Sequence, residues 1–195
     1  MKSVFIVFFF FFFFCNAQKF SFDYVLKYEK ENIRTKKKSE SVNYFNTHDY
    51  NYRLRLLRVD DKLVAELYDI KKNNTHNFDV IEQTKDNEIF FSFNYISTTK
   101  SYHLSLIDKS YFEFTNGDFG EVDLTIFKNR NKKKVECSYH LEMSNSEKNL
   151  FPAFRATQIH PYNNTQNLVY PENIVVERAT FMHRENTCEV RLVMK

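Results

Sequence analysis

Glycine is scarce in this chain of 195 residues, which contains only Gly117 and Gly120. A dinucleotide-binding fingerprint needs three glycines, and a phosphate-binding P-loop needs two at a wider offset, followed by Lys-Ser/Thr. The nucleophile elbow Gly-x-Ser-x-Gly is missing as well. These absences exclude the common nucleotide-binding loops and the elbow of the α/β-hydrolases.

Motifs for metal binding and catalysis are also missing. None of the six histidines forms a His-x-x-x-His or His-Glu-x-x-His spacing, so the usual zinc sites are absent. The acidic pair Asp60-Asp61 lies between Arg58 and Lys62, which is typical of a hairpin turn. We therefore expect a non-enzymatic protein without metal or cofactor. A metal site or a hydrolase site assembled from distant strands stays open as an alternative.

The chain has no strong excess of charge of one sign, with 28 basic and 25 acidic side chains. This balance predicts no nucleic-acid partner. Three turns are nevertheless basic, at 36–38, 71–72 and 130–134. In a simple up-and-down meander the first two share one end of the sheet and the third lies at the other end. Peripheral contact with an anionic surface is one interpretation, and solvated turns are the favoured one.

Residues 1–17 have the pattern of a signal peptide. Lys2 is followed by an unbroken apolar run at 4–14, which as a helix spans about 17 Å and is too short for a hydrocarbon core of about 30 Å. Cys15-Asn16-Ala17 supplies small residues for cleavage before Gln18. Lipidation at Cys15 is disfavoured, because the residue before it is the large Phe14. We expect export to the periplasm or the extracellular space, and a single β-rich domain over 18–195.

The chain beyond the leader contains two cysteines, Cys137 and Cys188. In an oxidising compartment two cysteines favour one disulfide. It would close a loop of about 50 residues and stabilise the fold by roughly 4 kcal/mol in the chain-entropy model. Two buried free thiols are the alternative.

Alternation of apolar and polar residues is the dominant pattern, and it predicts strands with one solvated face. It is clearest at 19–29, 134–143 and 187–195. Weaker alternation marks eight further segments, at 50–58, 62–70, 77–82, 88–96, 101–107, 111–115, 121–128 and 174–182. Asn116-Gly117 is the strongest hairpin motif. About eleven antiparallel strands predict a mainly β fold, as a curved sheet, half-barrel, barrel or sandwich.

No segment has a clear helical stripe. The best candidate, 145–158, contains Pro152, which argues against a helix interior. Residues 148–173 hold all three prolines of the chain and are expected to form a long irregular excursion before the last hairpin.

Aromatic residues suggest a ligand-binding face. Phe91, Phe93 and Tyr95 share one face of the predicted strand 88–96, while Phe90 and Ile96 lie on the other. A strand that is apolar on both faces must be covered on both faces, by core or by a ligand. An ordinary core is the favoured cover. The ligand interpretation makes Phe91, Phe93 and Tyr95 the candidate binding residues, with 148–173 as a lid.

The leader ending in Asn16-Ala17-Gln18 and the short strands rich in Phe, Tyr, Asn and Lys resemble small secreted envelope proteins of Gram-negative bacteria. Among known folds the chain is most similar to the lipoprotein-carrier type (LolA/LolB-like). That resemblance implies a strongly curved antiparallel sheet whose concave face is closed by helices, and it transfers no residues. We expect an exported binding protein for an apolar, acyl-chain-like ligand. The alternative is an envelope or surface module that binds a protein partner.

Overall fold

The computed structural model describes residues 19–100, 111–117, 120–159, 167–183 and 186–194. These residues form eleven strands and one helix: β1 (Tyr24–Asn32), β2 (Lys38–Phe45), β3 (Tyr52–Val59), β4 (Lys62–Asp69), β5 (Asn74–Lys85), β6 (Glu88–Lys100), β7 (Tyr111–Asn116), β8 (Glu121–Phe127), β9 (Val135–Asn145), α1 (Phe151–Gln158), β10 (Ile174–His183) and β11 (Asn186–Met194). The predicted mainly β fold is confirmed.

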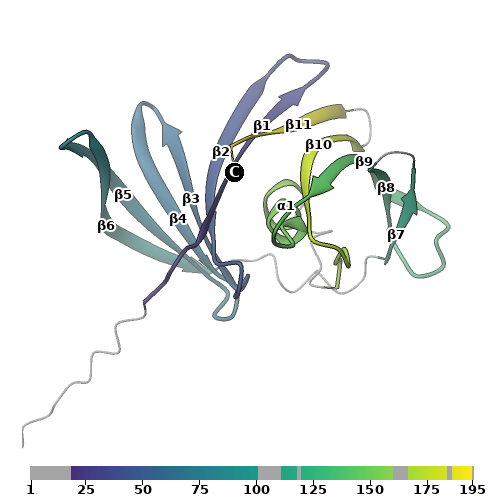
Figure 1. The fold of residues 1–195 in the computed structure, drawn as a ribbon, viewed down its shortest axis with the longest axis horizontal. Coiled ribbons are helices and arrows are strands. Elements are labelled where there is room, and N and C mark those ends of the chain that lie inside the picture. Colours follow the sequence, from purple (N-terminus) through teal and green to yellow (C-terminus); the bar gives the residue numbers. More distant parts are fainter. Residues whose placement is uncertain (1–18, 101–110, 118–119, 160–166, 184–185, 195) are drawn as a thin grey trace, which may run out of the picture.

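All eleven strands belong to one antiparallel sheet, in the order β6-β5-β4-β3-β2-β1-β11-β10-β9-β8-β7. Consecutive strands are neighbours except β6 and β7, which form the two edges, while the first and last strands pair in the middle, with Lys30 opposite Val190. The meander is therefore open between β6 and β7 and is not closed into a barrel. Figure 1 shows that the half containing β7–β11 bends around α1.

One strand was not predicted. The segment Lys38–Phe45 begins with four polar residues and then reads Val-Asn-Tyr-Phe, so it has no apolar–polar alternation. Conversely, the strand expected at 101–107 lies outside the described residues. The first strand also begins later than expected, at Tyr24, because residues 19–23 lie outside the sheet.

The additional strand β2 changes which turns share an end of the sheet. Successive turns of an antiparallel meander alternate between the two ends, so the turn after β1 and the turn after β4 lie at opposite ends. The prediction that the basic segments 36–38 and 71–72 share an end is therefore wrong. The segment 36–38 instead shares its end with the turn that contains 130–134, because β1 pairs antiparallel with β11.

The expected irregular excursion contains the helix α1. Pro152 lies in its first turn, where a missing backbone N–H removes no helical hydrogen bond, and Leu150 is its N-cap residue. The helix buries Phe151 and Phe154 against the sheet, and the Phe154 ring lies 6.0 Å from that of Tyr28. The argument from Pro152 against a helix was wrong, because the proline lies at the helix start.

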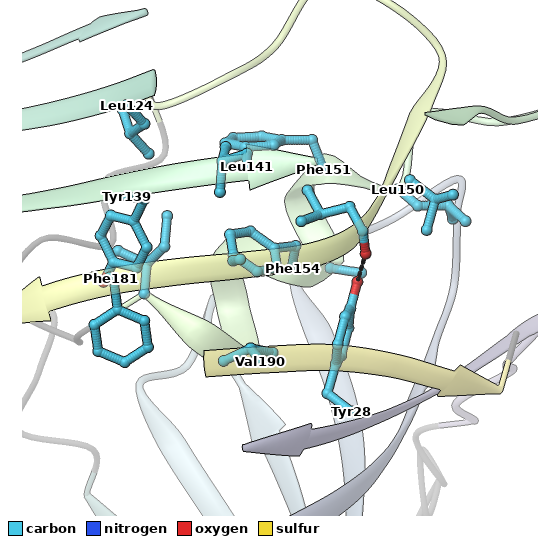
Figure 2. Packing of buried hydrophobic residues seen from close by; sticks show 14 of the residues in the cluster. Tyr28, Leu124, Tyr139, Leu141, Leu150, Phe151, Phe154, Phe181 and Val190 are labelled. Atoms are coloured by element: carbon cyan, nitrogen blue, oxygen red, sulfur yellow. Dashed lines mark hydrogen bonds between the residues drawn. The ribbon is translucent and has the colours of Figure 1, made fainter. Parts of the chain in front are cut away.

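The larger apolar core lies on the sheet face covered by α1, here called the helix face. Tyr28 is buried in this core and donates a hydrogen bond to the Val176 carbonyl oxygen at 3.1 Å (Figure 2). Burial raises the pKa of the Tyr28 phenol above its ordinary value. The core also contains Leu124, Tyr139, Leu141, Leu150, Phe151, Phe154, Phe181 and Val190.

A second, smaller core lies on the other face of the same sheet, here called the outer face. Directly paired residues of antiparallel strands share a face. Leu26 of the larger core is opposite Asn43, and Asn43 is opposite Arg55, so the helix face becomes polar beyond β2. The buried apolar residues of β3–β5 point the other way, and they are Leu54, Leu56, Ala65, Leu67 and Val80.

The segment before β1 packs on this second core. Phe20 and Phe22 meet Tyr52 edge to face, at ring distances of 5.0 and 5.7 Å. Asp23 then accepts hydrogen bonds from Lys148 at 2.7 Å and from the Thr47 hydroxyl at 2.5 Å. These bonds hold the pKa of the Asp23 carboxyl well below its usual range. Asp23 therefore fastens the N-terminal segment to the connection before α1.

Phe154→Ala is expected to lower the free energy of unfolding by about 3–5 kcal/mol, because it leaves a cavity between α1 and the sheet. The matched control is Phe90→Ala, which truncates a half-exposed ring on the edge strand β6 and should cost no more than about 0.5 kcal/mol. Urea unfolding followed by circular dichroism measures both. Equal losses for the two variants would contradict the assignment of Phe154 to the core.

Asp23→Asn is expected to reduce stability at pH 7 by about 1 kcal/mol or less, because the ion pair is partly exposed. A carboxyl whose pKa is lowered on folding stabilises the protein above its unfolded pKa of about 3.9, and this contribution is lost as pH falls through the folded pKa. The difference between wild type and variant should therefore shrink below about pH 4. Urea midpoints from pH 7 to pH 3 test this, with the exposed Asp79→Asn as control. A difference that does not depend on pH would contradict it.

Candidate functional site

A pocket of about 360 Å³ lies on the helix face, beside the end of α1. Its volume is within the range of natural small-molecule sites, about 300–1,000 Å³. Its lining has an apolar part and a polar part, with Cys137, Tyr139, Phe181 and Cys188 in the first and Lys30, Asn32, Thr35, Lys37, Ser39 and Gln158 in the second. The lining residues come from β1, β2, β9, β10 and β11, the turn after β1, and α1.

Cross-strand pairing positions the apolar part of the pocket. Cys188 is opposite Phe181, and Phe181 is opposite Tyr139, so the three side chains form one row across β11, β10 and β9. The rings of Phe181 and Tyr139 lie 5.0 Å apart at a tilt of 31°. Asn32 continues the row on β1, opposite Cys188. The pairing of the first and last strands therefore brings the polar and apolar parts together.

Two lysines make the polar part of the pocket positive. The Lys30 ammonium lies 4.8 Å from the centre of the Phe181 ring, at cation–π distance. Lys37 lies across the turn that follows β1. Neither forms an ion pair with another described residue, and no acidic side chain lines the pocket. The pocket thus combines an aromatic wall with two ammonium groups available to an anion.

The two cysteines are not bonded to each other. Both are free and buried, and the Cys137 thiol donates to the Met182 carbonyl oxygen at 3.3 Å. Cys137 lies on β9 and Cys188 on β11, with β10 between them, so their strands are about 10 Å apart. A disulfide needs Cβ atoms about 4 Å apart. The predicted disulfide is therefore wrong. Burial also raises the pKa of the Cys137 thiol, which keeps it protonated.

The predicted ligand residues Phe91, Phe93 and Tyr95 lie together on the edge strand β6, away from the pocket. Their side chains are on the outer face, where Phe91 packs against the second core. The ring of Phe78 on β5 lies 6.2 Å from that of Phe93 and 5.9 Å from that of Tyr95, both edge to face. Tyr95 is 61% exposed and Phe93 43%. They form an open aromatic surface, and their role as ligand residues stays a prediction.

The described part of 148–173 does not cover those three residues. Its helix and Tyr170 pack on the helix face, where Tyr170 meets Phe114 at 5.2 Å between ring centres. The expectation that this segment is a lid over Phe91, Phe93 and Tyr95 is wrong for the part that the structure describes. Residues 160–166 lie outside that part.

Metal binding finds no support among the described residues, since no three His, Cys, Asp or Glu side chains gather there at ligand distance. His103 and His160, as well as the leader with Cys15, lie outside these residues. In the same ranges, no helix has the length and apolar character needed to cross a bilayer.

Comparisons with known proteins give no relative. No protein-family model, no curated protein and no solved structure matches this chain. The resemblance to lipoprotein carriers and the export of the chain therefore stay predictions.

The pocket residues were missed because the sequence does not show which strands are neighbours. Tyr139 and Cys188 were assigned to the apolar faces of their strands, but the pairing of β1 with β11 places Lys30 beside them. Ser39, another polar residue of the pocket, belongs to β2, the strand that was not predicted. The available indication in the sequence was that the apolar faces of 134–143 and 187–195 each contain a cysteine near their start.

Thiol labelling tests the arrangement of the cysteines. Alkylation of the denatured, non-reduced protein is expected to modify both Cys137 and Cys188, as read by peptide mass spectrometry. In the native protein both should react much more slowly than a thiol introduced at exposed Thr115 by Thr115→Cys, because both are buried. An unmodified, disulfide-linked pair of peptides in the denatured sample would contradict the structure.

Proposed function

We propose that this chain is an exported, non-enzymatic protein that binds an apolar, acyl-chain-like ligand with an anionic end. The observation that supports the proposal is the pocket on the helix face, in which an aromatic wall adjoins two lysines that form no ion pair with any residue that the structure describes. Export is proposed from the leader-like residues 1–17.

The two parts of the pocket favour the two parts of such a ligand. Transfer of an alkyl segment from water to contact with Phe181, Tyr139 and the thiols is favourable. A carboxylate or phosphate at its end can form a charge-assisted hydrogen bond with Lys30 or Lys37. A neutral hydrocarbon would satisfy only the first of these parts. An acyl carboxylate therefore suits the pocket better than an uncharged lipid.

The open aromatic surface of β6 is a second location for the same activity. Phe91, Phe93 and Tyr95 present rings to solvent on the outer face, whereas the pocket is on the helix face. The surface is more exposed, and among the residues that the structure describes no cation lies over its rings. We therefore propose the pocket as the main site, and the experiment below separates the two.

Oleate and oleyl alcohol have the same alkyl chain, but only oleate has an anionic end. Comparing the binding of the two compounds therefore isolates the contribution of the charge. The double variant Lys30→Gln and Lys37→Gln is expected to weaken oleate binding by about tenfold, which corresponds to 1.4 kcal/mol, and to leave binding of oleyl alcohol within about twofold. Displacement of a fluorescent fatty acid measures both affinities. The matched control is the double variant Lys62→Gln and Lys85→Gln, in which two exposed lysines outside the pocket lose the same charge.

Two further results would decide against the pocket. If neither compound binds, and native mass spectrometry finds no lipid on the purified protein, the ligand-binding function is wrong. If Phe93→Ser and Tyr95→Ser abolish oleate binding while the lysine variants do not change it, the ligand binds on β6 instead.

A second candidate function is an envelope or surface module that binds protein. The specific observation in its favour is the exposed edge of β6, which offers backbone hydrogen-bonding groups to another strand.

A further inference from the structure

The strand β6 is a long, open sheet edge. It has 13 residues, and in the described part of the chain its only sheet neighbour is β5. Every second residue of an edge strand directs its backbone N–H and C=O away from the sheet. Such a row of unpaired groups is a template for a further strand.

Most of the features that protect natural edge strands are missing from β6. No proline and no charged residue occurs between Ile89 and Thr99. A bulge at Ile96, where the register with β5 shifts, leaves 88–95 as a regular segment. The other edge of the sheet differs, because β7 has only six residues and its Glu113 forms an ion pair with Lys132.

The outer face of this edge is apolar and largely exposed, and the helix face has one exposed ring between polar residues. Ile89 is 58% exposed on the outer face, beside the aromatic surface, and Phe90 is 47% exposed on the helix face. Single exposed apolar residues are common in soluble proteins, but a contiguous apolar strip indicates an interaction surface.

We propose that β6 pairs with β6 of a second copy of this chain, antiparallel and about a two-fold axis. The sequence of the regular segment is complementary to itself in this arrangement. With Ser92 on the axis, Ile89 lies opposite Tyr95 of the second copy and Phe91 lies opposite Phe93. All four are on the outer face, so each cross-strand pair on that face is apolar. The two sheets become one continuous sheet.

The charges at the two ends of β6 favour the same arrangement. Asp86 and Glu88 are at its start, where they outnumber Lys85, which is paired with Glu88, and Lys100 is at its end. Antiparallel pairing directs the acidic end of one copy towards the basic end of the other. Parallel pairing would place like charges together, and it would require a different symmetry from the two-fold axis of a closed dimer.

This pairing does not depend on the proposed ligand. The pocket is formed by β1, β2, β9–β11 and α1, and β6 contributes none of its residues. The aromatic surfaces of the two copies would adjoin along the new strand pair, and both pockets would keep their lining. Loss of ligand binding would therefore leave the dimer intact, and loss of the dimer would leave ligand binding intact.

Sedimentation of the protein and one pair of variants tests the dimer. The wild type is expected to be a dimer at about 100 µM. Phe93→Lys introduces a charge into the apolar pairs and should weaken dimerisation by at least about tenfold. The control Val193→Lys places the same charge at an exposed position of the central strand β11 and should leave the dimer unchanged. A monomeric wild type at this concentration would overturn the proposal.

Cross-linking tests the axis. A residue on a two-fold axis lies opposite its own copy, so Ser92→Cys is expected to form a disulfide-linked dimer under mild oxidation. Asp79→Cys, on the neighbouring strand β5, and Thr115→Cys, on the other edge, should not. Equal cross-linking of Ser92→Cys and Thr115→Cys would overturn the proposal. So would a dimer that persists with Phe93→Lys and does not cross-link through Ser92→Cys.

Discussion

The change of apolar face at β2 is the constraint on which the rest of this structure depends. Asn43 is fully buried on the helix face, where its amide donates to the Ser41 hydroxyl at 3.1 Å and accepts from the Arg53 guanidinium at 2.9 Å. Arg53 also lies over the Tyr68 ring at 4.1 Å, and its burial lowers its pKa to about 10. A polar network therefore occupies the helix face beyond β2, and the buried apolar side chains of β3–β5 point the other way.

This change gives one sheet two differently covered apolar surfaces. The short helix α1 covers the half formed by β1 and β8–β11, and the pocket lies where the helix ends. The other half is covered in part by Phe20 and Phe22, which do not extend to Tyr95 at the edge. A ligand-sized pocket and an open aromatic edge consequently occur in the same small protein, on opposite faces. The two proposals made for them are physically independent.

The alternation of apolar and polar residues predicted most of the strands. It failed where a tertiary contact, and not this alternation, determines the structure of the segment. The segment 187–195 alternates cleanly because one of its faces is buried and the other solvated, and it forms β11. The segment containing Asn43 does not alternate, since a buried amide takes an apolar position there, and β2 was missed. The presence of Pro152 within 145–158 argued against a helix there. A proline disrupts a helix only beyond its first turn, however, and Pro152 lies in the first turn of α1. The disulfide prediction failed for a similar reason. The alternation in the strands of Cys137 and Cys188 gives no indication that a third strand lies between them.

The amino-acid sequence by itself determined the mainly β class, the positions of the described strands other than β2, and the inward side chains of the clearest strands. These follow from a two-residue period that each segment carries on its own. Only the tertiary structure decided that the first and last strands pair, that the apolar face changes at β2, and that Lys30 meets Phe181. The reason is that strand neighbours are chosen by contacts between residues more than a hundred positions apart, such as Tyr28 and Val176, and no local pattern specifies such contacts.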